Sequence, residues 1–336
     1  MNTVDLKEAL GDVIKAGLVP MIHSSPALGK SDCVRQVAKE YKLKLIDVRL
    51  SQSDPCDLLG LPSFNEDKSK AQYVPFDIFP LESDPIPEGY DGWLIFLDEM
   101  NAAPMSVQAA AFKITLDRMV GIHHLHKNVA IICAGNKASD KGITNRISTP
   151  MQSRLIHLEL EVDHKSWITW ASKSDIDHRI ISFINFRPDN LYKFTPDHND
   201  HTFPSPRTYE FLSKLIKYKP LLDYKSLALM AGTVGMGMAR EFLGYTEIFK
   251  ELPTLNQIIA NPQLDISTEP SILYALTGLI AHNLSANNID KLIIFIGRLP
   301  IEFTIITLRQ ALAREVSLMD TPAMSNWIAN NHQELF

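Results

Sequence analysis

Residues 23–32 read HSSPALGKSD and lie between two segments with regular patterns. This stretch ends the apolar run LVPMIHS at residues 18–24 and opens a helical pattern, SDCVRQVAKEY, at residues 31–41. The tripeptide GKS at 29–31 is how a phosphate-binding loop ends, where loop amides and a helix N-terminus hold phosphate oxygens. The stretch therefore predicts a strand, a phosphate loop and a helix, in that order.

Two positions of this loop depart from the usual glycines, Ser24 and Ala27. Glycine at such positions permits a positive φ and a close approach of the backbone to phosphate. We expect a loop that binds nucleotide, but more weakly than a loop with all its glycines. Lys30 should reach the β- and γ-phosphates, and Ser31 should ligate magnesium. The residues predicted to contact the nucleotide are Ser24, Ser25, Pro26, Ala27, Leu28, Gly29, Lys30, Ser31 and Asp32.

A pair of carboxylates follows a second apolar run. GWLIFLDEMN, at residues 92–101, is a buried strand pattern that ends in Asp98 and Glu99. At the carboxyl end of a central strand, Asp98 can hold a magnesium-bound water and Glu99 can polarise the attacking water. The next run, AIICAGNK at 130–137, places Asn136 at the same edge, where an amide can orient that water or contact the γ-phosphate.

Apolar runs and helical patterns alternate through the first half of the chain. Several of the runs are apolar at consecutive positions, as in a parallel sheet covered on both faces. The alternation predicts an α/β fold with a central parallel sheet. The proline-rich, acidic segment 62–91 breaks the rhythm and is expected to be a loop. The expected strands are 18–24, 43–50, 92–99, 128–136 and 154–162, and the expected helices between them are 31–41 and 104–118.

The pattern changes to helices after about residue 163. Residues 290–297, DKLIIFIG, fit either a strand or a buried helix. We therefore expect two domains, an α/β nucleotide-binding core over 1–162 and an all-helical region over 163–336.

Composition sets further bounds. The chain has 336 residues, 45% of them hydrophobic, which is enough for substantial cores. No apolar stretch approaches the length of a membrane-spanning helix, and the amphipathic N-terminus lacks a signal-peptide core, so a cytoplasmic location is expected. The three cysteines are far apart and are expected to be small buried apolar residues. The net charge of −6 gives no general attraction to nucleic acid.

At this point the sequence resembles AAA+ ATPases, and in detail their MoxR-type branch. VRLSQSDPCDLLGLP at 48–62 is similar to that branch's second strand and the turn after it. FLDEMNAAPMSVQAAAFKITLDRMVG at 96–121 is similar to its Asp-Glu segment, helix and hairpin. FPSPRTYEFLSKLI at 203–216 resembles the lid helix that begins with Pro-Arg. The resemblance covers roughly residues 15–217 and implies a P-loop AAA+ core followed by a helical lid.

The resemblance also implies roles for further residues. Asn136 matches the sensor 1 position, and Arg207 matches the sensor 2 arginine of the lid. Arg154 matches the arginine finger that reaches the γ-phosphate of a neighbouring subunit, with Arg146 as the second candidate. The catalytic set is then Glu99, Asp98, Lys30, Asn136, Arg154 and Arg207, with ATP and Mg²⁺ as cofactors and Ser31 and Asp98 as metal ligands.

For function, the resemblance implies a ring, with six subunits expected, that hydrolyses ATP to remodel a protein partner such as a von Willebrand factor A-domain protein. An AAA+ motor or loader acting on nucleic acid fits the core equally well, although no nucleic-acid-binding motif or basic tail accompanies it. A third alternative is a scaffold that does not hydrolyse ATP, which the missing glycines would suit. Retention of Lys30, Ser31, Asp98 and Glu99 together argues against that alternative.

Overall fold

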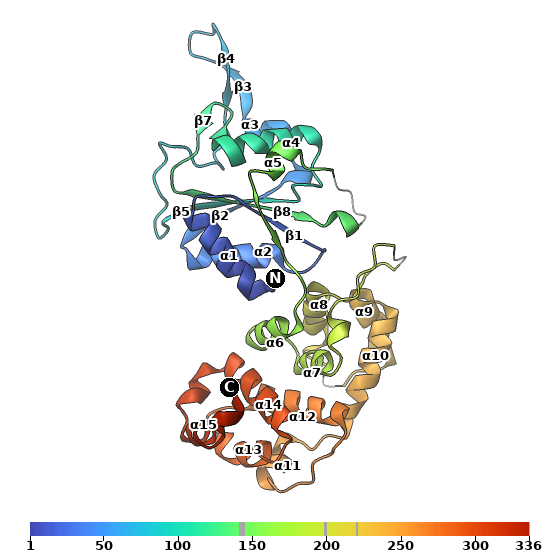
Figure 1. Cartoon of the computed structure of the whole chain (residues 1–336). Coiled ribbons are helices and arrows are strands. Elements are labelled where there is room, and N and C mark those ends of the chain that lie inside the picture. The colour runs from blue at the N-terminus through green and yellow to red at the C-terminus, as the bar shows by residue number, and fades with distance from the viewer. Residues whose placement is uncertain (141–144, 198–199, 220, 336) are drawn as a thin grey trace. The chain divides into compact units, whose positions relative to one another are not determined.

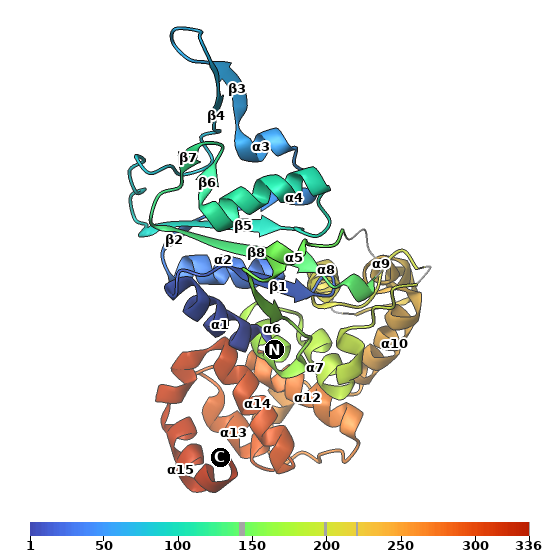
Figure 2. The ribbon, with the colours of Figure 1, turned by 45° about the horizontal axis from the view of Figure 1, so that its top comes forward.

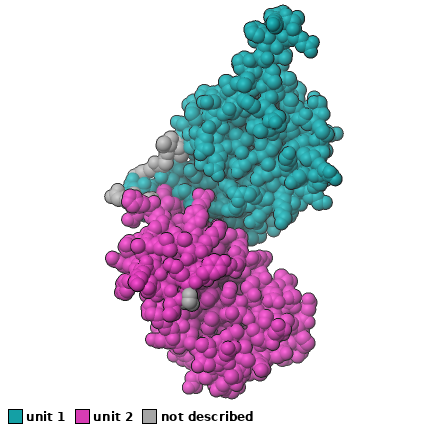
Figure 3. All heavy atoms as spheres, turned by 180° about the vertical axis from the view of Figure 1, so that it is seen from behind, with its two compact units in different colours: residues 1–162, 195–197 teal, residues 163–194, 198–336 magenta. Residues whose placement is uncertain are grey.

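The computed structural model describes residues 1–140, 145–197, 200–219 and 221–335. The chain divides into two compact units, one formed by residues 1–162 and 195–197 and the other by residues 163–194 and 198–336 (Figure 3). Within the described residues, no helix combines the length and the apolar character needed to cross a membrane.

The first unit is built on a parallel sheet of five strands within the described residues (Figure 1). Strands β5 and β8 lie inside the sheet and are buried almost throughout, as expected for strands covered on both faces. All five predicted strands are confirmed, and so is the predicted fold class, a central parallel sheet followed by a helical region. In spatial order the strands are β2 (Leu43–Arg49), β5 (Gly92–Asp98), β8 (Val129–Asn136), β1 (Pro20–Ser24) and β9 (Ile156–Glu159).

Helices cover both faces of this sheet (Figure 1 and Figure 2). On one face lie α1 (Thr3–Lys15) and α2 (Lys30–Glu40), and on the other lies α4 (Met105–Phe112). Alternate side chains of β5 point to opposite faces, so that Ile95 and Leu97 join the buried cluster on the α4 side. Further short helices of this unit are α3 (Pro55–Leu59), α5 (Thr149–Gln152) and the 3₁₀ turns Leu50–Gln52 and Ala138–Asp140.

The predicted helix over 104–118 is α-helical only in its first part. After α4 the chain continues as a π-helical turn, Lys113–Asp117, which ends at Arg118 with a φ of 54°. A small hairpin follows, formed by β6 (Met119–Val120) and β7 (His123–His124).

The prediction of a loop over residues 62–91 is wrong for the first part of that segment. Strands β3 (Leu61–Phe64) and β4 (Ala71–Val74) form an antiparallel hairpin that projects from the unit (Figure 1). The turn is closed by local hydrogen bonds, because the Asn65 side chain accepts from the Lys70 N–H at 3.0 Å. Both strands are exposed along their whole length, so they lack the half-buried alternation that makes a strand visible in a sequence. From residue 75 to 91 the expected irregular structure is observed.

The cysteines follow the expectation in part. Cys33 and Cys133 are buried, and burial raises the pKa of the Cys33 thiol to about 11. Cys56 is exposed on the short helix α3, so the expectation of a buried apolar role is wrong for that residue. The short helix α3 buries Leu58, and Cys56 is exposed on it.

The second unit is helical throughout its described residues. The ambiguous segment around 290–297 is a helix, and buried apolar side chains form two clusters along the unit. Its α-helices are α6 (His164–Lys173), α7 (His178–Phe186), α8 (Pro206–Ile216), α9 (Tyr224–Val234), α10 (Met236–Glu247), α11 (Leu255–Ala260), α12 (Pro270–Asn283), α13 (Ile289–Ile296), α14 (Ile301–Arg314) and α15 (Pro322–Leu335). Its 3₁₀ turns are Pro188–Leu191, Ile248–Lys250 and Val316–Asp320.

Candidate nucleotide site

The predicted site residues of the core gather where the parallel strands end. Strand β1 ends at Ser24 and leads through a short loop into α2, which begins at Lys30. Strands β5 and β8, which end at Asp98 and Asn136, lie beside β1 in the same sheet. The carboxyl ends of parallel strands form the edge at which α/β proteins bind ligands. We call Lys30, Ser31, Asp98, Glu99 and Asn136 the nucleotide edge.

The two departures from glycine in the loop differ in their consequences. Ser24 is the last residue of β1, fully buried and extended, so no glycine conformation is needed there. Ala27 has a φ of 63°, in the left-handed region that glycine adopts without strain. Gly29 has a φ of 88°, and a Cβ on it would meet no atom within 4 Å. The conformational strain of the non-glycine loop is therefore confined to Ala27.

Lys30 lies at the centre of the nucleotide edge. Its Nζ donates to the Ser24 Oγ at 2.9 Å, to the Ser24 carbonyl oxygen at 3.3 Å and to the Asn136 Oδ1 at 3.0 Å. The hydroxyl of Ser24, at the position of the missing glycine, thus helps to orient the lysine. A phosphate could replace these oxygens as acceptor, because the ammonium group is a rotatable donor of three hydrogen bonds.

Ser31 and Asp98 are the residues predicted to hold Mg²⁺, and the fold brings them together. The Ser31 Oγ donates to the Asp98 Oδ2 at 3.3 Å, although the two residues are 67 positions apart in the chain. Asp47 of β2 is close enough that, after burial, the Asp98 charge is the next cause that raises the pKa of the Asp47 carboxyl. A hydroxyl and carboxylate oxygens of this kind are the ligands that Mg²⁺ prefers, so the side chains fit the metal.

The side chain of Glu99 is positioned by a hydrogen bond from Ser51 that could not be predicted from the sequence. The Ser51 hydroxyl donates to the Glu99 Oε2, and the Glu99 N–H donates to the Asp98 Oδ1 at 2.8 Å. Glu99 has a φ of 58°, a conformation that costs free energy in a non-glycine residue and that turns its side chain out of the strand direction. Ser51 lies two residues after the end of β2, at the same edge of the sheet, and that position was the available signal.

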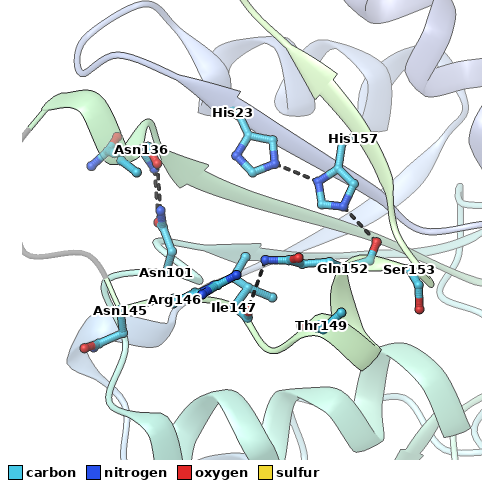
Figure 4. A pocket seen from close by; sticks show the side chains of 11 residues that line it. His23, Asn101, Asn136, Asn145, Arg146, Ile147, Thr149, Gln152, Ser153 and His157 are labelled. Atoms are coloured by element: carbon cyan, nitrogen blue, oxygen red, sulfur yellow. Dashed lines mark hydrogen bonds between the residues drawn. The ribbon is translucent and has the colours of Figure 1, made fainter.

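Asn101 fixes the position of Asn136 (Figure 4). Its side chain accepts from the Asn136 N–H at 3.1 Å and donates to the Asn136 carbonyl oxygen at 2.7 Å. A Cβ on Gly135 would lie 2.3 Å from the Asn101 Oδ1, so only glycine leaves room for this arrangement. Asn101 ends the motif GWLIFLDEMN, but the sequence alone indicates no role for it.

A further contact ties the phosphate loop to the segment after β8. The Ser25 Oγ donates to the Asp140 Oδ1 at 3.1 Å, and the Lys137 N–H donates to the Ser24 carbonyl oxygen at 3.2 Å. Asp140 was also missed, because it lies in a polar segment with no periodicity.

A cavity of about 880 Å³ lies beside Asn136 (Figure 4). His23 and His157 line it with stacked rings, and their Nε2 and Nδ1 atoms are 2.8 Å apart. Burial first, and then the neighbouring His157, lower the pKa of His23. Arg146, the second arginine-finger candidate, also lines this cavity. Asn136 is the only residue of the nucleotide edge that lines this cavity. The cavity therefore lies next to the expected phosphate site and is separate from it.

Of the two remaining predicted arginines, Arg154 lies away from the nucleotide edge of its unit, and Arg207 belongs to the second unit. Arg154 is exposed and donates to the Pro150 carbonyl oxygen at 3.0 Å, just before β9. Because Pro20 and Ile156 are register partners, Arg154 lies beyond the end of β1 opposite to the phosphate loop. That strand spans about 13 Å from Pro20 to Ser24. Arg207 is exposed in the first turn of α8, in the second unit.

Comparison with known proteins adds a likeness in fold. No protein-family model matches the sequence, and no curated protein matches it. Among solved structures, the chain is similar to a "putative ATPase" from Cytophaga hutchinsonii, with 14% identity, a TM-score of 0.38, and coverage of 98% of this chain and 88% of that chain.

The chain is also similar to the RuvB Holliday junction branch migration motor of Thermotoga maritima. The identity is 14% and the TM-score 0.40, over 78% of this chain and 82% of that chain. For a point mutant of the same motor the identity is 16% and the TM-score 0.39, over 80% of this chain and 86% of that chain. At these identities and TM-scores the likeness carries no conclusion about activity, and the chain's own side chains must do so.

Proposed function

We propose that this chain is an Mg²⁺-dependent ATP hydrolase of the AAA+ type. One observation carries the proposal: Lys30, Ser31, Asp98, Glu99 and Asn136, from three separate segments, meet at one edge of a parallel sheet. A lysine, an amide and paired carboxylates at the N-terminus of a helix are the groups that binding and cleavage of a nucleoside triphosphate require.

ATP is expected to bind by an exchange of hydrogen bonds. The phosphate oxygens would take the place of the Ser24 and Asn136 oxygens around the Lys30 ammonium group. The amides of the loop and of the first turn of α2 would complete the cradle, and the open space at Gly29 leaves its backbone accessible. Ser31 and Asp98 would hold Mg²⁺, which neutralises charge on the transferring phosphoryl group when it is bound.

Hydrolysis is assigned to Glu99. Its carboxylate would take a proton from a water molecule while the water oxygen attacks the γ-phosphorus. The bond from that phosphorus to the bridging oxygen breaks, and ADP leaves with the electron pair. The Ser51 hydroxyl donates to one oxygen of the Glu99 carboxylate, Oε2, which leaves the other oxygen to accept the proton. Asn136, positioned by Asn101, would orient the water or the γ-phosphate.

The place of Arg154 supports assembly into a ring. At the opposite end of β1 from Lys30, it cannot contact the phosphate bound to its own loop, but it is exposed and available to a neighbouring subunit. We propose a hexameric ring in which Arg154 reaches the γ-phosphate of the next subunit and Arg207 completes the site from the helical unit. In keeping with the MoxR resemblance, we propose that the ring acts in the cytoplasm, like a chaperone, to remodel a protein partner, with a von Willebrand factor A-domain protein as the leading candidate.

Two inactive variants test this proposal together. Glu99→Gln should lower kcat by about 10²–10⁴-fold, because the proton acceptor is lost, while the affinity for Mg-ATP stays the same. Arg154→Ala should be similarly inactive. Mixing the two proteins should recover phosphate release, because some interfaces then pair an intact Glu99 with an intact Arg154.

Glu88→Gln is the matched control, since Glu88 is an exposed carboxylate of the same unit. An unchanged kcat for Glu99→Gln would contradict hydrolysis at this edge. Loss of activity in both variants without recovery on mixing would contradict the role of Arg154 across subunits, and recovery with Arg146→Ala in its place would assign that role to Arg146.

A further inference from the structure

We propose that the helical unit holds a second ligand site, a pocket that binds a small molecule through a phosphate or carboxylate group. The pocket lies between α6, α7, α12 and α14 and has a volume of about 290 Å³. That volume is at the lower end of ligand pockets, roughly 300–1,000 Å³, and suits a small metabolite. We call it the anion pocket, and it is lined by Ser172, Lys173, Asp175, Ile176, His178, Ile181, Gly278, Ala281, His282, Gln310 and Arg314.

An unpartnered donor points to a missing ligand. Gln310 is 7% exposed, and its Nε2 is buried without a hydrogen-bond partner among the described residues. Buried polar groups in native proteins are nearly always hydrogen-bonded, because an unpartnered donor has lost its bonds to water and gained none. Since Gln310 lines the pocket, an acceptor atom of a ligand would satisfy it.

The charges of the lining favour an anion. Asp175 is the one carboxylate among the described lining residues, and it is already ion-paired with Lys217. Lys173 has no ion-pair partner among the described residues. Arg314 donates to the Leu284 carbonyl oxygen and lies 3.6 Å from a Glu315 oxygen, which leaves further N–H groups of its guanidinium for a ligand.

Two stacked histidines add donors that respond to an anion. The rings of His178 and His282 lie 5.1 Å apart, at an angle of 27°. Burial lowers the pKa of both, and that of His178 falls to about 4, so both rings are neutral at physiological pH. His178 also faces Asp177 and Arg179, while His282 faces Arg314, Asp177, Asp175 and Lys217. An anion in the pocket would favour the protonated rings, so its binding should be accompanied by proton uptake.

The helix packing holds these groups in place. A Cβ on Gly278 would lie 2.9 Å from the Ser182 Cβ and 3.1 Å from the His178 carbonyl oxygen. Glycine at this position therefore lets α12 approach α7 closely enough for the two histidine rings to stack. The pocket is enclosed by elements with firm mutual packing and involves no residue of the nucleotide edge.

The test uses the full chain with the substitution Lys30→Ala, which weakens binding of the added anions to the phosphate loop. Sulfate, inorganic phosphate and succinate are titrated by calorimetry and by the shift in Tm. We expect at least one of them to bind with a dissociation constant of about 1 mM or tighter. Sulfate or phosphate binding indicates a phosphate ligand, and succinate binding indicates a carboxylate ligand. Sulfate stays a dianion throughout, so its affinity should be higher at about pH 6 than at about pH 8 because the histidines take up a proton.

Variants separate a binding role from a structural one. Gln310→Leu should weaken anion binding at least tenfold, yet leave Tm without anion unchanged or higher, because the unpartnered donor is gone. Lys173→Gln should also weaken binding. Arg309→Gln, which removes an exposed charge from α14, the helix that carries Gln310, should not. The proposal is overturned if none of the three anions binds, or if binding is as strong in Gln310→Leu as in its parent.

Discussion

The nucleotide edge of the first unit and the anion pocket of the second are both clusters of polar side chains, but they are held in different ways. At the nucleotide edge, Lys30, Asn136, Ser31 and Asp98 satisfy one another through hydrogen bonds of 3.0–3.3 Å. In the anion pocket, burial lowers the pKa of His178 to about 4, and the Gln310 Nε2 has no hydrogen-bond partner among the described residues. The polar groups of the first cluster are thus hydrogen-bonded to one another without a ligand. The second cluster contains a buried donor that only a ligand or water would satisfy.

The largest effect expected from this difference is on acid stability, through His178. A folded pKa of about 4 against an ordinary value of 6.5 means that the unfolded chain binds the proton more tightly. The neutral ring therefore contributes its stability in full above pH 6.5, and this contribution is lost as the pH falls through about 4. The difference of 2.5 pKa units corresponds to about 3 kcal/mol. In urea unfolding at several pH values, His178→Phe should lose about 3 kcal/mol less than the unmodified chain over this range.

His124→Phe is the control, because His124 is exposed in β7 of the first unit. It should follow the pH dependence of the unmodified chain. If His178→Phe did so too, burial of that ring would not be what distinguishes the two clusters.

A smaller effect is expected at the nucleotide edge, from Asn101→Ala. This change removes both side-chain hydrogen bonds to the Asn136 backbone and leaves buried groups unpartnered, at a cost of about 1–3 kcal/mol. Because Asn136 loses its position, kcat should fall as well, while the affinity for Mg-ATP changes little. Asn65→Ala in the β3–β4 turn, which removes hydrogen bonds far from the edge, should leave kcat intact. A fully active Asn101→Ala enzyme would show that catalysis does not need Asn101 to hold Asn136 in position.

The smallest effect is expected from Ala27→Gly. The left-handed conformation of Ala27 costs about 1 kcal/mol that glycine avoids, partly offset by the greater freedom of glycine in the unfolded chain. ATP affinity should therefore be equal or slightly higher. Gly29→Ala should act in the opposite sense, because its φ of 88° strains alanine although the space around it is open. Weaker ATP binding by Ala27→Gly would mean that the loop follows another path when nucleotide is bound.

Much of the nucleotide edge could be predicted from the sequence because strand ends carry it. Buried parallel strands are continuous apolar runs, and the polar residue that ends each run must lie at one edge of the sheet. Asp98, Glu99 and Asn136 could be predicted in this way, and Lys30 from the GKS pattern that opens a helix. Ser51 also follows a strand, β2, but a single serine after a strand is indistinguishable from an ordinary turn residue.

Other features could not be predicted because they depend on contacts between distant residues. The β3–β4 hairpin is exposed on both faces, so no hydrophobic period marks it. Asp140 acts through Ser25, which is 115 residues earlier. The anion pocket joins His178 to Gln310 through the packing of four helices, and a lone histidine or glutamine in a helical pattern gives no sign of that.

The central claim is that HSSPALGKSD works as a nucleotide-binding loop although it lacks two glycines, and calorimetric titration of Mg-ATP tests it most directly. The unmodified chain and Lys39→Ala, which removes an exposed lysine of the same helix α2, should bind with equal affinity. Lys30→Ala should bind about tenfold to a hundredfold more weakly, because charge-assisted hydrogen bonds to the phosphates are lost. Equal affinity of Lys30→Ala and Lys39→Ala, or no binding of Mg-ATP by the unmodified chain, would contradict the account.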